Sequence, residues 1–156
     1  MPPGSRLQFE LGGADIRSAA AEQGDGLEAA ARTARYDFLC QIAEKLGARF
    51  VAVAHTLDDQ VETVLHRVFR GTGVAGLAGI PFARPLSPSV TLIRPLLGVS
   101  RQQVIEYLRR LDQGYRTDAS NDDMRFTRNR LRRKLLPLLR SEFNADVDAA
   151  ILRLSD

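Results

Sequence analysis

The chain has 156 residues, 44% of them hydrophobic, and a formal net charge of +3 at pH 7. This length suits one domain and is sufficient to bury a core. The sequence has no apolar run of membrane-spanning length and no signal-peptide pattern, so we expect a cytoplasmic protein that does not engage a membrane. The single cysteine, Cys40, excludes an internal disulfide.

Local patterns in the first third of the chain predict two strands and one helix. Residues 7–11 alternate in polarity, which predicts a short strand, and the glycine pair at 12–13 predicts a turn after it. Residues 26–46 carry apolar side chains at helical spacing and are followed by Gly47, a residue type that commonly ends helices. Residues 50–54 are an unbroken apolar run, typical of a strand buried on both faces.

The most informative segment begins where that run ends, at His55. Thr56 is placed to cap a helix, predicted over residues 57–70, whose third residue is Asp59. Asp59 and Glu62 share one face of that helix, and open α/β sheets bind ligands at such strand ends. His55, Asp59 and Glu62 are therefore candidate site residues. The alternative is that the acids only stabilise the helix dipole and that the histidine is an ordinary loop residue.

The remainder of the chain is predicted to be mostly helical. Residues 91–94 predict a further short strand, and Ser100 is placed to cap a helix over residues 100–111. Residues 128–153 predict a helical segment that Pro137 kinks or splits.

This last segment is strongly basic. From Arg125 to Arg140, a stretch that we call the basic segment, the sequence has seven basic residues and no acid. Leucines at helical spacing would hold these side chains on a stable surface, which suits contact with the phosphate backbone of a nucleic acid. The alternative is a solvated charged face without a partner.

Three segments resemble the tRNA(Ile)-lysidine synthetases, a family of PP-loop ATP pyrophosphatases. They are residues 27–39, 54–73 and 118–132, and the phrase at 93–97 is also similar to that family. The resemblance implies an α/β fold: a partial Rossmann-like parallel sheet of the adenine nucleotide alpha hydrolase type, flanked by helices. It implies that residues 1–98 form the C-terminal part of the PP-loop α/β domain, and that residues 99–156 form a basic helical segment packed on it.

The resemblance also implies an activity for the complete enzyme. With ATP and Mg²⁺, lysidine synthetases adenylate the wobble cytidine of tRNA(Ile) and join free lysine to it with loss of AMP. Their catalytic residues match Asp59 and Glu62, and their nucleotide-binding residues match His55 and Arg35. Contact with RNA or phosphate is assigned to four arginines: Arg125, Arg128, Arg130 and Arg132. The ligands of the metal are unknown, and a homodimer is left open.

The family's phosphate-binding loop, Ser-Gly-Gly-x-Asp-Ser, has no counterpart here, because Leu11 and Ile16 stand where its serines should be. The first strand of the family's fold is also lacking. We therefore expect a truncated form that does not consume ATP by itself, and whether the chain is an enzyme is left open. The alternative is a non-catalytic tRNA-binding or scaffold module that retains the second half of the fold.

Overall fold

A computed structural model describes residues 8–23, 26–116, 123–124 and 126–155. The chain divides into two compact units. Unit 1 comprises residues 1–51 and 84–93, and unit 2 comprises residues 52–83 and 94–156. The predicted division into residues 1–98 and 99–156 stays a prediction. Among the described residues, no helix combines the length and the apolar character that crossing a membrane requires.

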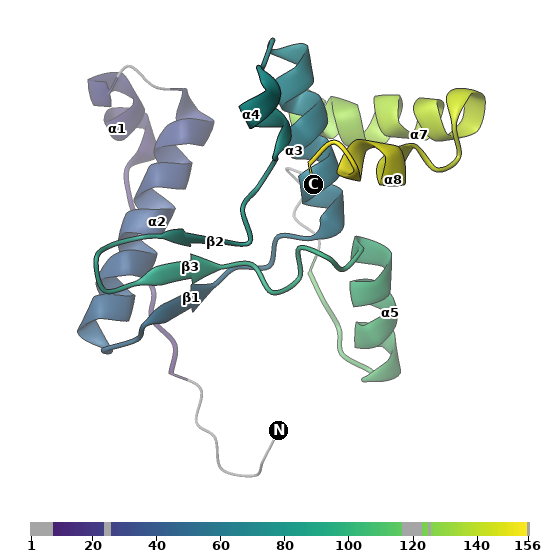
Figure 1. Ribbon diagram of the computed structural model, residues 1–156. Helices are drawn as coiled ribbons and strands as arrows, with labels where there is room; N and C mark the ends of the chain where they lie inside the picture. The colour runs from purple at the N-terminus through teal and green to yellow at the C-terminus, as the bar shows by residue number, and fades with distance from the viewer. Residues whose placement is uncertain (1–7, 24–25, 117–122, 125, 156) are drawn as a thin grey trace. The chain divides into compact units, whose positions relative to one another are not determined.

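Among its described residues, unit 1 contains most of the small sheet and two helices, α1 (Ile16–Gln23) and α2 (Leu27–Lys45). The strands are β1 (Phe50–Ala52), β2 (Ala83–Pro85) and β3 (Thr91–Ile93), in the order β1-β3-β2. In Figure 1, β1 and β3 run in the same direction, and β2 and β3 form a hairpin. The predicted α/β fold is thus confirmed, and the predicted parallel pairing applies to β1 and β3.

Strand order explains which strand is buried. The central strand β3 carries Leu92, which is fully buried, whereas Phe50 at the start of the edge strand β1 is 60% exposed. The prediction that residues 50–54 are buried on both faces was therefore wrong, because a strand at the sheet edge lacks a neighbour on one side. β2, which was not predicted, occupies the other edge, where Pro85 is tolerated because no further strand needs its amide.

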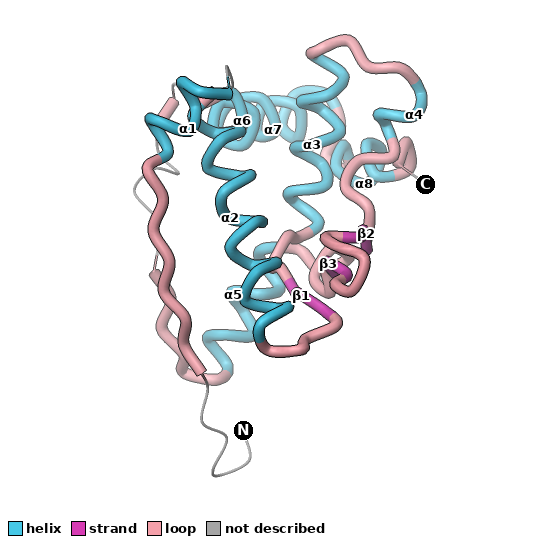
Figure 2. The backbone as a smooth tube through the Cα atoms, turned by 90° about the vertical axis from the view of Figure 1, so that its left-hand side faces the viewer, coloured by secondary structure: helices cyan, strands magenta, loops and turns pink. Residues whose placement is uncertain are grey.

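The segment before α1 is not a strand, although its alternating sequence predicted one. Residues 8–15 have no regular structure and run alongside α2 (Figure 2). Lys45 of α2 donates a hydrogen bond to Glu10 at 3.2 Å. Gly12 lies so close to Phe38 that a Cβ there would stand 2.5 Å from the ring. The contacts of this segment go to a helix, and no strand pairs with it among the described residues.

Unit 2 is helical and is built around α3 (Leu57–Phe69). Its other helices are α4 (Val74–Leu77), α5 (Arg101–Arg110), α6 (Thr127–Arg130), α7 (Leu136–Leu138) and α8 (Val147–Leu152). Two π-helical turns, Leu131–Leu135 and Leu139–Phe143, flank α7. The helix therefore stays continuous across the proline at position 137, and wider turns on either side accommodate the missing amide hydrogen bond.

The core of unit 2 brings together residues that are far apart in the sequence. Val61 and Val64 of α3 pack against Leu136 of α7 and Ile151 of α8, and all four are at most 6% exposed. Burial of each such side chain contributes about 1.5–3 kcal/mol to folding. This packing fixes α3 against the basic segment and so determines which of its arginines meet the acids of α3.

Candidate functional site

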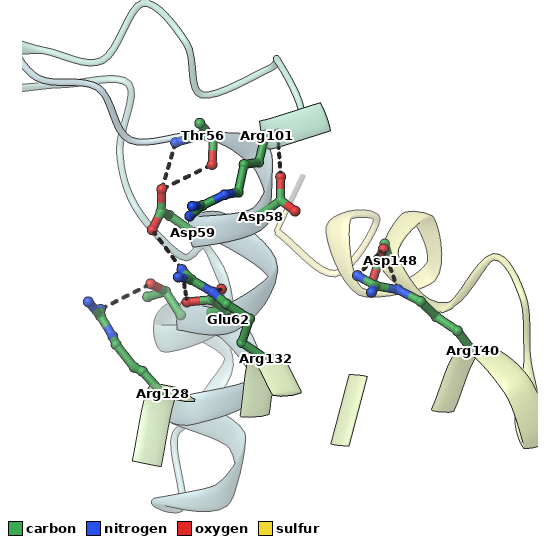
Figure 3. Close-up of polar contacts among 10 residues, drawn as sticks. Thr56, Asp58, Asp59, Glu62, Arg101, Arg128, Arg132, Arg140 and Asp148 are labelled. Atoms are coloured by element: carbon green, nitrogen blue, oxygen red, sulfur yellow. Dashed lines mark hydrogen bonds and ion pairs between the residues drawn. The ribbon is translucent and has the colours of Figure 1, made fainter. Parts of the chain in front are cut away.

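The first turn of α3 is fixed by its own acids (Figure 3). The backbone N–H and the hydroxyl of Thr56 both donate to Asp59 Oδ2, at 2.8 and 3.0 Å. Asp58 Oδ2 accepts the backbone N–H of Arg101 at 2.7 Å, at the start of α5. The predicted capping arrangement of Thr56 and Asp59 is confirmed. Asp59 thus has a structural role in this turn, whatever other role it performs.

One turn later, Glu62 lies buried in an ion pair with Arg132. The guanidinium donates from Nε to Oε1 at 2.5 Å and from Nη2 to Oε2 at 3.0 Å, a bidentate geometry. Arg132 Nη2 also lies 3.8 Å from Asp59 Oδ1. Figure 3 shows this guanidinium between the two acids of α3. The sequence predicted that Arg132 contacts RNA or phosphate, and its described partners are these carboxylates.

Burial sets the electrostatics of this pair. Desolvation raises the pKa of Glu62 above its ordinary value of 4.5, and the hydrogen bond and charge of Arg132 oppose that rise only partly. Partial burial by itself would lower the pKa of Arg132, but Glu62 and the acids before it raise it overall. Arg132 is therefore the group that most favours the ionised form of this buried carboxylate.

The other predicted arginines of the basic segment have different surroundings. Arg128 Nη2 approaches the hydroxyl of Thr63 at 3.5 Å, the longest contact of this group. Arg130 is exposed and donates to Thr127 of its own helix at 2.9 Å. Arg125 lies outside the described residues. His55 is half-buried just before α3. The structure thus brings Asp59, Glu62, Arg128 and Arg132 together.

Arg35, the remaining predicted site residue, belongs to unit 1 and lies in a cluster of cations. The guanidinium carbons of Arg32, Arg35 and Arg84 stand 5.0, 5.4 and 4.8 Å from the centre of the Tyr36 ring. These are cation–π distances, and Tyr36 as a whole residue is only 6% exposed. The sequence predicted Arg35 alone. The three guanidinium groups form a concentrated positive surface that suits an anion.

A loop clamp, formed by Gln60, Arg67 and Arg94, was missed by sequence reasoning. Gln60 donates to the carbonyl of Ala78 at 3.4 Å and accepts the N–H of Ile80 at 2.6 Å. Arg67 Nη1 donates to the carbonyls of Gly76 and Gly79, at 2.9 and 2.8 Å. Arg94, 1% exposed, donates to the carbonyl of Pro81 at 2.6 Å. All three side chains hold main-chain atoms of the glycine-rich loop after α3.

Gly79 is the residue that allows this close approach. Its φ of +62° lies in the left-handed region, and a Cβ there would stand 2.6 Å from the Gln60 amide nitrogen. The clamp becomes evident only from the structure, where the run from Gln60 to Val64 is buried although it contains two polar residues and one acid. Buried polar groups need partners, and here the partners are the loop and Arg132.

The comparisons with known proteins decide the family. The family model described as the PP-loop domain matches residues 5–139. The chain belongs to this PP-loop family. It is 43% identical over 136 residues to tRNA(Ile)-lysidine synthase of Porphyromonas gingivalis, covering 86% of this chain and 28% of that protein. It is 43% identical over 129 residues to tRNA(Ile)-lysidine synthase of Gloeobacter violaceus, covering 83% of this chain and 40% of that protein.

The resemblance to lysidine synthetases is therefore confirmed, and the PP-loop chain spans well under half the length of these relatives. A solved structure, the U34-tRNA thiolase NcsA of Methanococcus maripaludis, agrees in fold. Its TM-score is 0.56 at 18% identity, over 80% of this chain and 42% of that one. At this level of identity the likeness concerns the fold alone.

The acids of this PP-loop chain do not form a ready magnesium site. Both oxygens of Glu62 hold Arg132, and one oxygen of Asp59 holds Thr56. Within the described part of the chain, no group of three histidine, cysteine or acidic residues is placed to bind a metal ion. The donor set therefore does not fit Mg²⁺, which prefers a nearly octahedral shell of oxygens.

Proposed function

We propose that this chain serves tRNA(Ile)-lysidine synthesis: in a complete enzyme it contributes to the ATP-dependent ligation of free lysine to the wobble cytidine of tRNA(Ile). The observation that carries the proposal is the 41–43% identity to lysidine synthases over 83–88% of this chain. The basic segment of unit 2 supports a tRNA partner. Such an enzyme acts in the cytoplasm, where its tRNA, ATP and lysine are found, and a homodimer is a further proposal.

Each candidate residue has a role that its surroundings support. Asp59 Oδ1 is the one oxygen of the two site acids that accepts no hydrogen bond among the described residues, so it is the candidate acceptor for a proton from the attacking lysine amine. Glu62 acts through Arg132, which it holds beside Asp59. Arg128, whose contact with Thr63 is long, and the exposed Arg130 are the candidates for contact with phosphate.

The nucleotide-binding candidates that the sequence proposed are Arg35, in unit 1, and His55, in unit 2. ATP supplies the adenylate that activates the cytidine, and its polyphosphate fits the positive surface around Tyr36. Arg32 and Arg84 would add to the charge that Arg35 provides there. In this proposal the guanidinium groups supply charge, whereas a backbone cradle of N–H groups supplies geometry in PP-loop enzymes.

A second candidate function is a non-catalytic tRNA-binding or scaffold module. It is favoured by the structural roles of the acids, since Asp59 caps α3 and Glu62 neutralises Arg132. The two candidates share the tRNA partner and differ only in lysidine formation. They are distinguished by placing this segment in a complete lysidine synthase, incubating it with tRNA(Ile), lysine, ATP and Mg²⁺, and analysing the nucleosides by mass spectrometry.

The test of the shared partner is a filter-binding titration with labelled tRNA(Ile). We expect affinity to fall about 10³-fold or more between roughly 50 and 200 mM salt. Replacing Arg128 and Arg130 by Gln should reduce the slope of log affinity against log salt by about two, roughly one for each phosphate that is no longer neutralised. Arg132 is left unchanged because its removal would leave the buried carboxylate of Glu62 without its charged partner.

The matched control removes the same amount of charge from another basic helix. Arg109 and Arg110 lie on α5 and are exposed. Their replacement by Gln should leave the salt slope near that of the wild type. Equal slopes for the wild type and both double variants would count against tRNA binding by the basic segment.

A further inference from the structure

An apolar groove lies between the end of α3 and the basic segment of unit 2. It has a volume of about 420 Å³. Its lining consists of Phe69 and six residues of the basic segment: Thr127, Arg130, Leu131, Lys134, Leu135 and Leu138. The six recur every three or four residues, so they form one face of the helix. The groove is thus made by two elements that the core of unit 2 holds in place.

Apolar and cationic side chains line the groove together. Phe69 is 62% exposed and Leu138 is 43% exposed, so their apolar surfaces face solvent. Arg130 and Lys134 line the same groove and are both exposed. No acidic residue occurs between positions 125 and 140 of the sequence. An occupant must therefore combine an apolar face with negative charge.

We propose that this groove holds an unstacked nucleotide of single-stranded RNA. The inference rests on the proposed function for the identity of the RNA, a loop of tRNA(Ile), and on charge complementarity for the occupant. The base would stack on the Phe69 ring against the leucines, and its phosphates would lie on Arg130 and Lys134. Because the lining offers few hydrogen-bonding groups, the groove holds a base without reading its identity.

The decisive experiment removes the aromatic ring of Phe69 from the protein and, separately, single bases from the RNA. Fluorescence anisotropy is measured with labelled tRNA(Ile), and separately with a single-stranded RNA oligonucleotide. Phe69→Leu keeps an apolar side chain and removes the ring. Since one base–aromatic stack corresponds to about tenfold in affinity or somewhat more, we expect binding about tenfold weaker with an unchanged salt slope. Arg130→Gln should instead lower the salt slope by about one.

The matched control is Phe143→Leu. Phe143 is 74% exposed in the same unit and does not line the groove, so this variant should bind within about twofold of wild type. A series of RNAs, each with one abasic nucleotide, locates the base. One position should weaken wild-type binding about tenfold and have no further effect in Phe69→Leu. Thermal melting of both variants confirms that the fold is kept.

Three results would overturn the inference. Wild-type affinity of Phe69→Leu for both RNAs would show that no base stacks there. A wild-type dimer in light scattering that Phe69→Leu abolishes would assign the groove to a second copy of the chain. If neither RNA binds the wild type, the inference and the proposed function both fail. Phe69-dependent binding of the oligonucleotide without binding of tRNA(Ile) would overturn only the proposed function.

Discussion

Removal of Arg132 tests whether the buried ion pair holds unit 2 together. The side chain of Glu62 is 4% exposed and that of Arg132 is 30% exposed. Loss of one partner of a buried pair costs about 3–5 kcal/mol, because the other charge is left uncompensated. Since Arg132 is only partly buried, we expect Arg132→Met to lower the free energy of unfolding by about 3 kcal/mol, at the lower end of that range.

A double-mutant cycle isolates the interaction. Glu62→Gln leaves no buried negative charge and keeps a carbonyl acceptor for the guanidinium, so it should cost only about 1–2 kcal/mol. The double variant removes both charges and should also cost about 1–2 kcal/mol, far less than the sum of the single variants. The measurement is urea denaturation followed by far-ultraviolet circular dichroism.

The exposed pair Glu106–Arg110 on α5 is the control, with side chains 56% and 73% exposed. Arg110→Met should cost no more than about 0.5 kcal/mol, as is usual for such surface pairs. The reasoning would be refuted if the losses of unfolding free energy in the two single variants, at Glu62 and at Arg132, summed to the loss in the double variant within about 0.5 kcal/mol.

The destabilisation caused by Arg132→Met should depend on pH. Burial raises the pKa of Glu62 above 4.5, so the folded state binds this proton more tightly than the unfolded chain does. Stability contributed by protonated Glu62 is therefore lost as the pH rises through the folded pKa. Without Arg132 that pKa rises further and the loss extends to higher pH. The destabilisation by Arg132→Met should be larger near pH 8 than near pH 5, and equal values would contradict this account.

Three further predictions concern the loop, the acid pair and ATP. Gly79→Ala should destabilise the chain by about 1–3 kcal/mol through its positive φ and the approach of Gln60. Gly98→Ala, where a Cβ meets nothing within 4 Å, should be nearly neutral in the same urea titration. In a complete lysidine synthase carrying this segment, Asp59→Asn should cut lysidine formation by orders of magnitude, and near-normal turnover would leave helix capping as its role. The purified chain with tRNA(Ile), lysine, Mg²⁺ and labelled ATP should release no AMP, and lysine-dependent AMP would reveal a substitute phosphate site.

Local signals in the sequence were sufficient where one short segment determines its own structure. The capping pairs Thr56–Asp59 and Ser100–Gln103 start α3 and α5 as expected, because each needs only residues within one helical turn. The fold class followed from the family resemblance of three segments, residues 27–39, 54–73 and 118–132. Residues 8–11 failed for the opposite reason: an alternating segment becomes a strand only when a partner strand is present, and its contacts go to α2 instead.

The candidate site depends on contacts that one sequence does not encode locally. Glu62 and Arg132 are separated by 70 positions, and nothing near either residue identifies the other as its partner. The charge pattern predicted a basic surface correctly but could not distinguish Arg132, which is engaged with an acid, from Arg130, which is exposed. Burial of Arg94 was equally hidden, because its acceptors are carbonyl oxygens that any sequence supplies.

The loop clamp has a consequence for how freely this segment can vary. Gln60, Arg67 and Arg94 bond to backbone carbonyl and amide groups, so these hydrogen bonds do not need a particular side chain at the exposed positions of the loop. Val74, the first residue of α4, is 85% exposed and should accept nearly any replacement in a saturation library. Insertion or deletion of one residue between positions 76 and 81 would instead shift every clamped atom out of register. The loop is thus fixed in length, whereas its composition is free at exposed positions such as Val74 and restricted at Gly79.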